Sequence, residues 1–260
     1  MCFHNGIDIN RATHIQLNKQ EKSIADYELN LHMPHASGFD YPQWPVLKPV
    51  AGGLDFMPCM MHWEFIPSYL RGWDAVLHFR KGGLNPVTGK KDFPHNTLNA
   101  IGEEVLNKPT YKNAALYRRC LVLSSGFYEW RHFTPVGGKD TAYPYYISCK
   151  DREYFFMAGI WNPWIDQESG EVVESFAILT TAANSIMSGI HNKKKRMPVI
   201  LPENEAAEWL RDDLSRERIS TLAAYTIADH ELMAYTIRKD FRLLEEPREP
   251  FEYQELPAIP

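Results

Sequence analysis

The first residues of the chain, MCFHNG, could do chemistry that an internal cysteine cannot do. Cys2 directly follows Met1, and a start methionine is removed most easily when the next side chain is small. The chain would then begin with a free α-amine and a thiol on adjacent carbons. The amine condenses with an aldehyde to an imine, and the thiol closes onto the same carbon as a five-membered thiazolidine. Both groups keep a nucleophilic fraction near neutral pH, because their ordinary pKa values are about 7.7–8.0 and about 8.5. Position alone also fits a small residue that has no function.

A carboxyl group stands where proton transfer could be useful. Glu129 follows a buried apolar run and is flanked by Tyr128 and Trp130 in SGFYEW. Apolar neighbours remove water from a carboxylate and raise its pKa, which suits the group to moving protons. A solvated glutamate at the end of a strand is the alternative.

Two further polar residues could take part. His191 precedes four consecutive cations, Lys193–Arg196, and then a buried strand. Such a histidine could transfer protons next to a phosphate, although a basic run is commonly just a solvated loop. Asn99 follows HNTL at an expected helix start, where an ordinary N-cap is the competing interpretation.

The elements that must position these residues are mostly short strands. Alternating or continuous apolar runs predict strands at 60–66, 120–130 with a turn at Gly126, 145–149, 154–161, 176–181 and 197–201. Helices are expected at 14–31, 99–107, 183–190 and 203–214. Many short strands with few long helices indicate an antiparallel α+β domain rather than a parallel α/β fold. We expect one domain over 1–244 and a proline-rich strap or tail over 245–260.

Composition excludes several classes of protein. With 260 residues and 44% hydrophobic content, the chain can bury one sizeable core, and no apolar run approaches a membrane span. The four cysteines are scattered, with neither a CxxC pair nor a secretory signal, so a reducing cytoplasm fits best. His62-x-Glu64 mimics part of a zinc deaminase motif, but no PCxxC completes it, so we expect no metal. The net charge of −5 argues against coating nucleic acid, but it leaves room for one basic groove.

Five segments together resemble the SRAP family (SOS response-associated peptidase, or abasic-site processing protein). They occur in family order over residues 1–201 and read MC, HWEFIP, LNA with EEV, RRCLVLSSGFYEW and IHNKKKRMPVIL. The SGFYEW and H-x-x-x-x-RMPVIL segments are specific in combination, whereas either alone is weak.

The resemblance implies a single domain built on a mostly antiparallel, barrel-like β-sheet with peripheral helices. It also implies a DNA damage function, in which the mature N-terminal cysteine forms a thiazolidine with the ring-opened aldehyde of an abasic site in single-stranded DNA. Cys2 would be the nucleophile, Asn99 would position the amine and the sugar, Glu129 would shuttle protons, and His191 would assist ring opening and reversal. Met1 would be removed, with self-cleavage as one route, and a lyase side activity could accompany the imine. The family implies a monomer without cofactor or metal.

DNA contacts are also implied by matching positions. A basic groove with an aromatic platform would hold the strand, since stacking a base contributes about 1–3 kcal/mol regardless of sequence. Trp63 would line the pocket or simply pack. The expected DNA-binding residues are Trp130, Arg196, Tyr69, Lys195 and Arg118.

The chain departs from the family pattern at two cationic positions. Many members begin MCGR, whereas this chain has Phe3 and His4, and the common NAR-x-E pattern is NAIGE here, with Ile101 in place of arginine. Losing two phosphate contacts would weaken DNA affinity and its salt dependence. Compensating cations are expected in Lys193–Arg196 and in Arg118 and Arg119.

Two other functions compete with this one. An N-terminal-nucleophile amidohydrolase would use Cys2 on an amide with its own amine as base, but it needs an oxyanion hole and long layered strands, of which the sequence gives no sign. A non-catalytic single-strand-binding module would make Cys2 incidental. Replacing Cys2 separates the second alternative from covalent capture.

Overall fold

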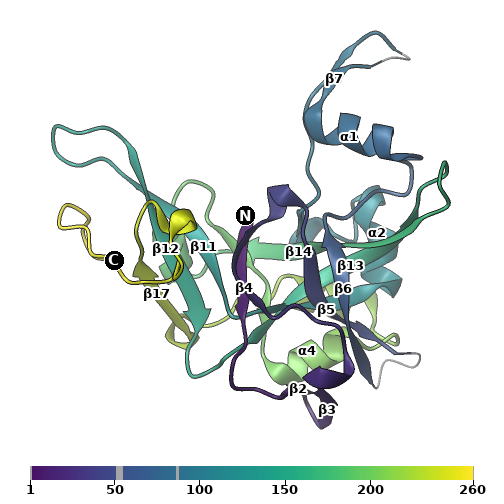
Figure 1. The fold of residues 1–260 in the computed structure, drawn as a ribbon, viewed down its shortest axis with the longest axis horizontal. Coiled ribbons are helices and arrows are strands. Elements are labelled where there is room, and N and C mark those ends of the chain that lie inside the picture. The colour runs from purple at the N-terminus through teal and green to yellow at the C-terminus, as the bar shows by residue number, and fades with distance from the viewer. Residues whose placement is uncertain (1, 51–54, 86–87, 260) are drawn as a thin grey trace.

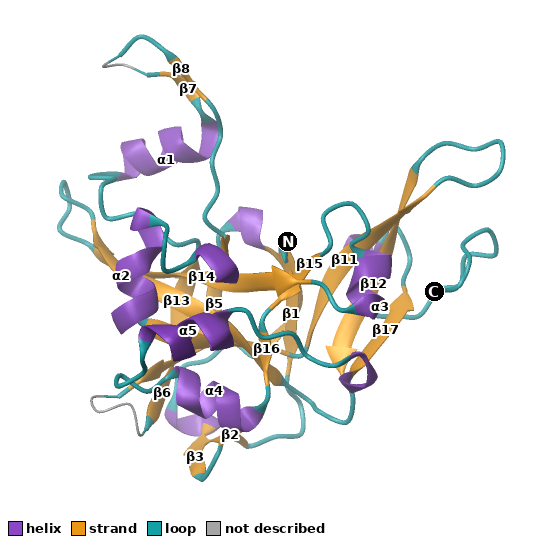
Figure 2. Ribbon diagram, turned by 180° about the vertical axis from the view of Figure 1, so that it is seen from behind, coloured by secondary structure: helices purple, strands orange, loops and turns teal. Residues whose placement is uncertain are grey.

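Two large β-sheets carry most of the buried residues in the computed structural model, which describes residues 2–50, 55–85 and 88–259 (Figures 1 and 2). The strands are β1 (His4–Asp8), β2 (His14–Leu17), β3 (Gln20–Ser23), β4 (His32–Ser37), β5 (Gln43–Pro49), β6 (Phe56–Trp63), β7 (Gly83–Leu84), β8 (Lys91–Asp92), β9 (Asn99–Ile101), β10 (Arg119–Ser124), β11 (Gly126–Phe133), β12 (Thr141–Cys149), β13 (Phe155–Ile165), β14 (Val172–Ala182), β15 (Arg196–Pro198), β16 (Ile200–Leu201) and β17 (Leu232–Thr236). The α-helices are α1 (Trp73–Lys81), α2 (Pro109–Tyr117), α3 (Ser185–Ile190), α4 (Glu203–Trp209) and α5 (Arg216–Ala223). Short 3₁₀ turns are η1 (Ile24–Asp26), η2 (Gly38–Asp40), η3 (Gly102–Glu104), η4 (Asp229–Glu231) and η5 (Phe241–Leu243).

Five strands close into a barrel in the order β14-β6-β5-β10-β13, with β13 pairing back to β14. The β6–β14 pair is parallel and the other four pairs are antiparallel. Three large aromatic side chains fill its core: Trp63 lies 5.7 Å from Trp44 and 6.3 Å from Phe176, measured between ring centroids. Burial of such rings is a main source of stability in a small core. The expected single α+β domain with a mostly antiparallel, barrel-like sheet is confirmed.

The second sheet, in the order β17-β12-β11-β1-β4, holds the start of the chain. β1 lies between β4 and β11, with His4 opposite Ser37 on one side and Tyr128 on the other. The chain crosses from the barrel to this sheet at Ser125, between β10 and β11. Gly126 permits the crossing, because a Cβ there would lie 2.2 Å from the ring of Tyr146.

The helix expected over 14–31 is wrong. Ile15 and Leu17 are buried at alternate positions of β2, and β2 pairs with β3 as a hairpin. The turn contains Asn18 with φ of +56°, a left-handed conformation that asparagine tolerates better than most residues. The charged residues between the apolar ones therefore lie on the exposed face of a small hairpin.

The helix expected over 99–107 is also wrong at its start. Asn99–Ile101 forms β9 and pairs in parallel with Ile178–Thr180 of β14, so tertiary pairing overrides the local pattern. Asn99 is therefore a strand residue and no N-cap. Pro109 begins α2 instead of ending a helix, in keeping with the preference of proline for the first helical turn.

Two parts of the chain project from the body (Figures 1 and 2). One is an arm made of α1 and the β7–β8 hairpin, and the other is the end of the β11–β12 hairpin. The start of the chain lies between them in both views. Arg80 of α1 holds the arm to the barrel, since its Nε donates to the buried Glu64 carboxylate at 2.9 Å and its guanidinium lies 3.5 Å from the ring of Tyr41.

Residues 245–259 run along the second sheet. The Nη1 of Arg131 donates to the carbonyl of Pro257 at 2.6 Å, the hydroxyl of Tyr253 donates to that of Ile237 at 2.8 Å, and Tyr143 donates to Glu255 at 3.0 Å. The division of the chain at residue 244 remains a prediction.

We predict that Gly102→Ala destabilises the fold. A Cβ on Gly102 would lie 1.8 Å from the carbonyl oxygen of Ala223 at the end of α5, and backbone cannot move aside as a side chain can. Overpacking of this kind costs about 1–3 kcal/mol, occasionally more. Urea denaturation of the two proteins measures the difference in unfolding free energy.

Gly72→Ala is the matched control. The nearest heavy atom to its added Cβ is a side-chain oxygen of Glu168 at 3.5 Å, an ordinary contact. We expect this variant to lose about 1 kcal/mol or less, since only the N-cap of α1 changes. Equal losses in the two variants would contradict the packing argument.

Candidate active site

A cavity of about 400 Å³ opens beside the start of the chain. Its walls come from the N-terminal segment, from β11 and β12, from the loop after α3 and from η5. The lining residues are Phe3, His4, Glu129, Trp130, His132, Ala142, His191, Lys193, Lys194 and Arg242. Two of the predicted catalytic residues, Glu129 and His191, therefore share one cavity. Its rim is rich in cations.

Glu129 lies on β11 with its side chain turned inward. The residue is 4% exposed, and burial raises the pKa of its carboxyl group to about 7. The predicted rise in the pKa of Glu129 is therefore present, and the alternative of a solvated glutamate at a strand end is wrong. A carboxyl group in this state is partly protonated at neutral pH, so it can both give and take a proton.

His191 faces this carboxyl group through a defined nitrogen. Its Nδ1 lies 2.8 Å from the carbonyl oxygen of Arg196, which can only accept, so Nδ1 carries the hydrogen. Its Nε2 is then the acceptor of the neutral ring and lies 4.0 Å from Oε2 of Glu129. Burial lowers the pKa of His191 to about 4, so the ring is neutral at pH 7.

Backbone contacts fix the position of the His191 loop. The side chain of Asn192 accepts from the N–H of His132 at 3.1 Å and donates to the carbonyl of His132 at 2.7 Å. This two-way bond attaches the loop to β11, three residues from Glu129. His191 itself ends α3, whose first turn is capped by Asn184. The two hydrogen bonds between Asn192 and the backbone of His132 thus set the distance between Glu129 and His191.

Cys2 directly precedes Phe3 and His4, which line the cavity, and is not itself a lining residue. It is fully buried, and its thiol lies 3.8 Å from the carbonyl oxygen of His4. Burial, and after it the negative charge of Glu129, raise the pKa of the Cys2 thiol far above its usual range. The thiol is therefore neutral. Met1, whose removal is expected, lies outside the described residues.

Asn99 offers an amide close to the same segment. Both polar atoms of its side chain are buried and have no hydrogen-bond partner among the described residues. Its neighbour Leu98 packs beside Gly38, whose N–H donates to the carbonyl of Phe3 at 2.8 Å. Orphaned polar groups cost free energy and are found at functional sites. Asn99 thus has donors and an acceptor available for a ligand.

The predicted DNA-binding residues divide into two groups. Trp130 lines the cavity and contacts His4 edge-on at 4.9 Å between ring centroids. Lys195 is exposed on the His191 loop and adopts φ of +50°. Arg196 does not line the cavity, because its guanidinium binds both carboxylate oxygens of Glu103 at 2.8 and 2.7 Å.

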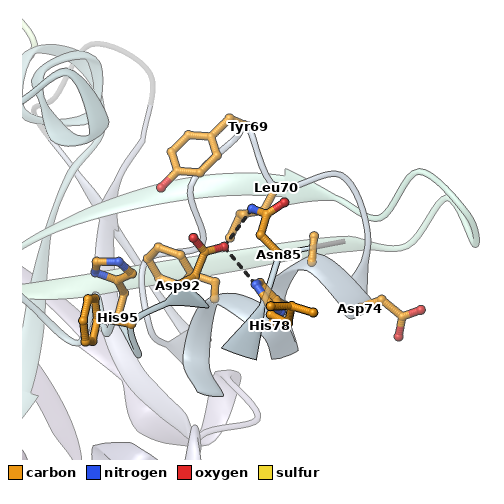
Figure 3. Close-up of a pocket in the computed structure, with 11 residues that line it drawn as sticks. Tyr69, Leu70, Asp74, His78, Asn85, Asp92 and His95 are labelled. Atoms are coloured by element: carbon orange, nitrogen blue, oxygen red, sulfur yellow. Dashed lines mark hydrogen bonds and ion pairs between the residues drawn. The ribbon is translucent and has the colours of Figure 1, made fainter. Parts of the chain in front are cut away.

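Tyr69 and Arg118 lie elsewhere. Tyr69 lines a separate hollow of about 790 Å³ between α1 and the β7–β8 hairpin, which shares no lining residue with the first cavity. Figure 3 shows it beside a polar cluster in which Asp92 accepts from His78 at 3.0 Å and from Asn85 at 2.8 Å. Arg118 ends α2 and donates to Asn113 and to the carbonyl of Trp161.

One secondary expectation is wrong. Arg119 is buried and donates to the carbonyl oxygens of Ala115, Leu116 and Trp209, so it cannot replace a lost phosphate contact. Trp63 is fully buried in the barrel core and packs there. His62 lies in β6 as expected, whereas Glu64 follows the strand and forms the ion pair with Arg80.

Arg242, which no sequence pattern singled out, reaches the cavity from η5. No local motif marks this residue, and only the fold brings it beside His4. Among the described residues, no group of three or more His, Cys, Asp or Glu side chains is arranged to hold a metal ion. None of the helices in the described ranges combines the length and apolar character needed to cross a membrane.

Curated relatives match part of the chain. It is 31% identical over 131 residues to the abasic site processing protein YoqW of Bacillus subtilis, covering 50% of this chain and 55% of the relative. It is 34% identical over 158 residues to the abasic site processing protein HMCES of Gallus gallus, covering 53% of this chain and 46% of the relative. The chain thus spans about half the length of the curated relatives it matches.

Solved structures match over nearly the whole chain. A crystal structure of a protein from Bacteroides thetaiotaomicron is similar with a TM-score of 0.75 and 30% identity, covering 96% of this chain and 97% of the other. A protein of Bordetella bronchiseptica shares the fold, with a TM-score of 0.63 and 18% identity over 91% of this chain and 100% of the other. The family model described as SOS response associated peptidase (SRAP) matches residues 57–242. The chain therefore belongs to the SRAP family.

Proposed function

We propose that this protein captures abasic sites in single-stranded DNA by closing Cys2 onto the ring-opened sugar as a thiazolidine. The observation that carries the proposal is the buried carboxyl group of Glu129, which lies 4.0 Å from Nε2 of His191 and close enough to Cys2 to influence its thiol. Two curated relatives are named abasic site processing proteins, which supports the substrate class. Removal of Met1 is part of the proposal, because it frees the α-amine of Cys2.

The reaction needs only the aminothiol and a proton shuttle. The amine of Cys2 adds to the aldehyde carbon C1′, and the resulting carbinolamine loses water to give an imine. The thiol then adds across the C=N bond, which forms the S–C1′ bond and moves one proton from sulfur to nitrogen. One water leaves overall, and nothing is oxidised or reduced.

Glu129 fits the shuttle role because its pKa is raised to about 7 by burial. In its protonated form it can donate to the departing hydroxyl of the carbinolamine. In its ionised form it can accept the thiol proton, which the buried Cys2 retains until that step. A group that both donates and accepts works best when its pKa lies near the working pH.

His191 is better suited to orienting and accepting than to acting as the acid. The lowered pKa of about 4 leaves its ring neutral at pH 7, with Nε2 as acceptor toward Glu129. The acid that protonates O4′ when the deoxyribose ring opens is then Glu129 in its protonated form, and Nε2 of His191 can accept the proton that the C1′ hydroxyl releases. This assignment refines the role that the family resemblance implies for the histidine.

Substrate binding would use polar, aromatic and cationic groups that can still bind a ligand. The amide of Asn99, whose polar atoms have no partner among the described residues, can hold the amine or a sugar hydroxyl. Trp130 can stack a base at the cavity mouth, and Lys194 and Lys195 can lie beside phosphates. Arg196, Tyr69 and Arg118 would contact DNA only along a longer stretch of strand.

The remaining parts of the proposal follow from the same chemistry. The protein is proposed to act as a monomer. An imine at C1′ also permits β-elimination, so a lyase side activity can accompany capture. The four cysteines are free thiols, which supports a reducing compartment such as the cytoplasm.

The direct test is intact mass after incubation with an oligonucleotide carrying one abasic site. We expect the protein to lack Met1 and to gain the mass of the DNA strand less one water. Cys2→Ala and Cys2→Ser should form no adduct that survives denaturing conditions without reduction, because both keep the amine and lose the thiol. Both should form only an imine, which borohydride traps.

Cys59→Ala is the matched control, because this cysteine is half-buried on β6 and outside the cavity. It should form the adduct at the wild-type rate. Incubation with glutamine and peptide amides tests the competing amidohydrolase function. Amide hydrolysis without an adduct, or a Cys2→Ala protein that retains DNA under denaturing conditions, would refute covalent capture through Cys2.

Glu129→Gln should slow adduct formation about 10²–10⁴-fold, the usual contribution of a proton-transferring side chain. The wild-type rate should change with an inflection near pH 7, where Glu129 titrates, and the variant should lack this inflection. Single-turnover rates between pH 5 and about pH 9 provide the measurement. Glu168→Gln, on the exposed loop between β13 and β14, should behave as wild type in both respects.

The same substitution should stabilise the fold at high pH. The pKa of Glu129 is raised from 4.5 to about 7, so between these values the unfolded chain releases the proton while the folded chain retains it. Wild type therefore loses stability, relative to Glu129→Gln, as pH rises from 4.5 to about 7, and the difference is constant above. It amounts to roughly 3 kcal/mol at most. Urea denaturation at two pH values, one near each limit, measures it, and a pH-independent difference would show that Glu129 is not buried in this way.

A further inference from the structure

The cavity rim holds a cation that the proposed reaction does not use. Arg242, from η5, lines the cavity opposite the loop that supplies Lys193 and Lys194. Lys193 is neutralised by Asp140 at 2.8 Å. Arg242 forms no ion pair with a carboxylate of the described residues. Its positive charge is therefore uncompensated within the described part of the cavity.

Arg242 is held in place by groups that leave its charge intact. Its Nη2 donates to Nε2 of His4 at 3.3 Å, and its guanidinium lies 5.6 Å from the ring centroids of both Trp130 and Phe241. Phe241 is buried and stacks on Tyr128 of β11 at 5.0 Å between centroids. The turn that carries Arg242 is therefore anchored to the strand that carries Glu129.

His4 serves as an uncharged acceptor for this arginine. A guanidinium can only donate, so Nε2 of His4 accepts and its Nδ1 carries the hydrogen, which it donates to Nε2 of His35 at 3.1 Å. Burial, together with the charge of Arg242, lowers the pKa of His4 to about 3, which keeps the ring neutral. Position 4 thus orients a cation without supplying one.

We propose that Arg242 binds a backbone phosphate of the DNA strand whose abasic sugar enters the cavity. The guanidinium has five N–H donors and spends one on His4, so a fork remains for two oxygens of a phosphate. The ring of Trp130, beneath the guanidinium, fixes its plane beside the expected stacking position. The identity of this anion rests on the proposed function, since the cavity would take a phosphate next to the captured sugar.

The experiment compares two variants at this exposed position: Arg242→Gln removes the positive charge, and Arg242→Lys keeps it. Binding of an intact, unmodified single-stranded oligonucleotide is measured by anisotropy over a series of salt concentrations. The slope of log K against log salt should fall by about 0.7 in Arg242→Gln, and affinity should drop about 3- to 10-fold. Arg242→Lys should keep the wild-type slope.

Lys239→Gln is the matched control. It removes the same charge from the same segment, but Lys239 lies over the rings of Tyr143 and Tyr253 and away from the cavity. Its slope should equal that of wild type. An unchanged slope in Arg242→Gln, or equal losses in the Gln and Lys variants or in the Lys239 control, overturns the phosphate site.

The oligonucleotide carries no aldehyde, so this measurement is independent of Cys2. Adduct formation by wild type together with an unchanged slope in Arg242→Gln refutes the phosphate site and leaves the proposed function standing. A reduced slope in Arg242→Gln, together with no adduct of wild type on abasic DNA, supports the phosphate site and refutes the proposed function.

Discussion

The site depends on the removal of one carboxyl group from water. Glu129 is 4% exposed at the inner face of β11, and the resulting rise of its pKa to about 7 turns a permanent anion into a group that exchanges protons at neutral pH. Keeping that group buried requires the aromatic wall of β11, the N-terminal segment and the His191 loop together. The N-terminal segment is attached to β11 by backbone pairing, and the His191 loop is attached by side-chain bonds to the backbone of β11. The strand therefore supports the whole site.

This arrangement explains why three distant parts of the sequence can act as one unit. β1 pairs with β11 at His4 and Tyr128. The side chain of Asn192 bonds both the N–H and the carbonyl of His132, and Phe241 stacks on Tyr128. The N-terminus, the loop after α3 and the C-terminal turn therefore share one strand as their support. Positions fixed in this way are precise without any covalent or metal crosslink.

The central strands were predictable because their pattern is dominated by burial. The run 119–124 is buried throughout, and apolar residues there leave no alternative to a core strand. Glu129 was recognised for the same reason, as a carboxyl group in an apolar stretch. Residues 14–31 and Asn99 were misassigned because their conformation is decided by partners far away in sequence, a hairpin turn at Asn18 in one case and β14 in the other. Arg242 lies 238 residues from its partner His4, and no local signal encodes that contact.

The arm made of α1 and the β7–β8 hairpin is anchored to the barrel by Arg80, whose guanidinium meets Glu64 and the ring of Tyr41, and by an apolar cluster in which Val76 and Trp73 of α1 pack with Trp164 and Val173. Beyond this anchor the hairpin adds strands to neither large sheet, since β7 and β8 pair with each other. Its length can therefore change without shifting the barrel or β11, because exposed hairpin ends tolerate insertion and deletion well. Insertions or deletions in the hairpin would leave the pairing of β1 with β11, and so the surroundings of Cys2, unchanged.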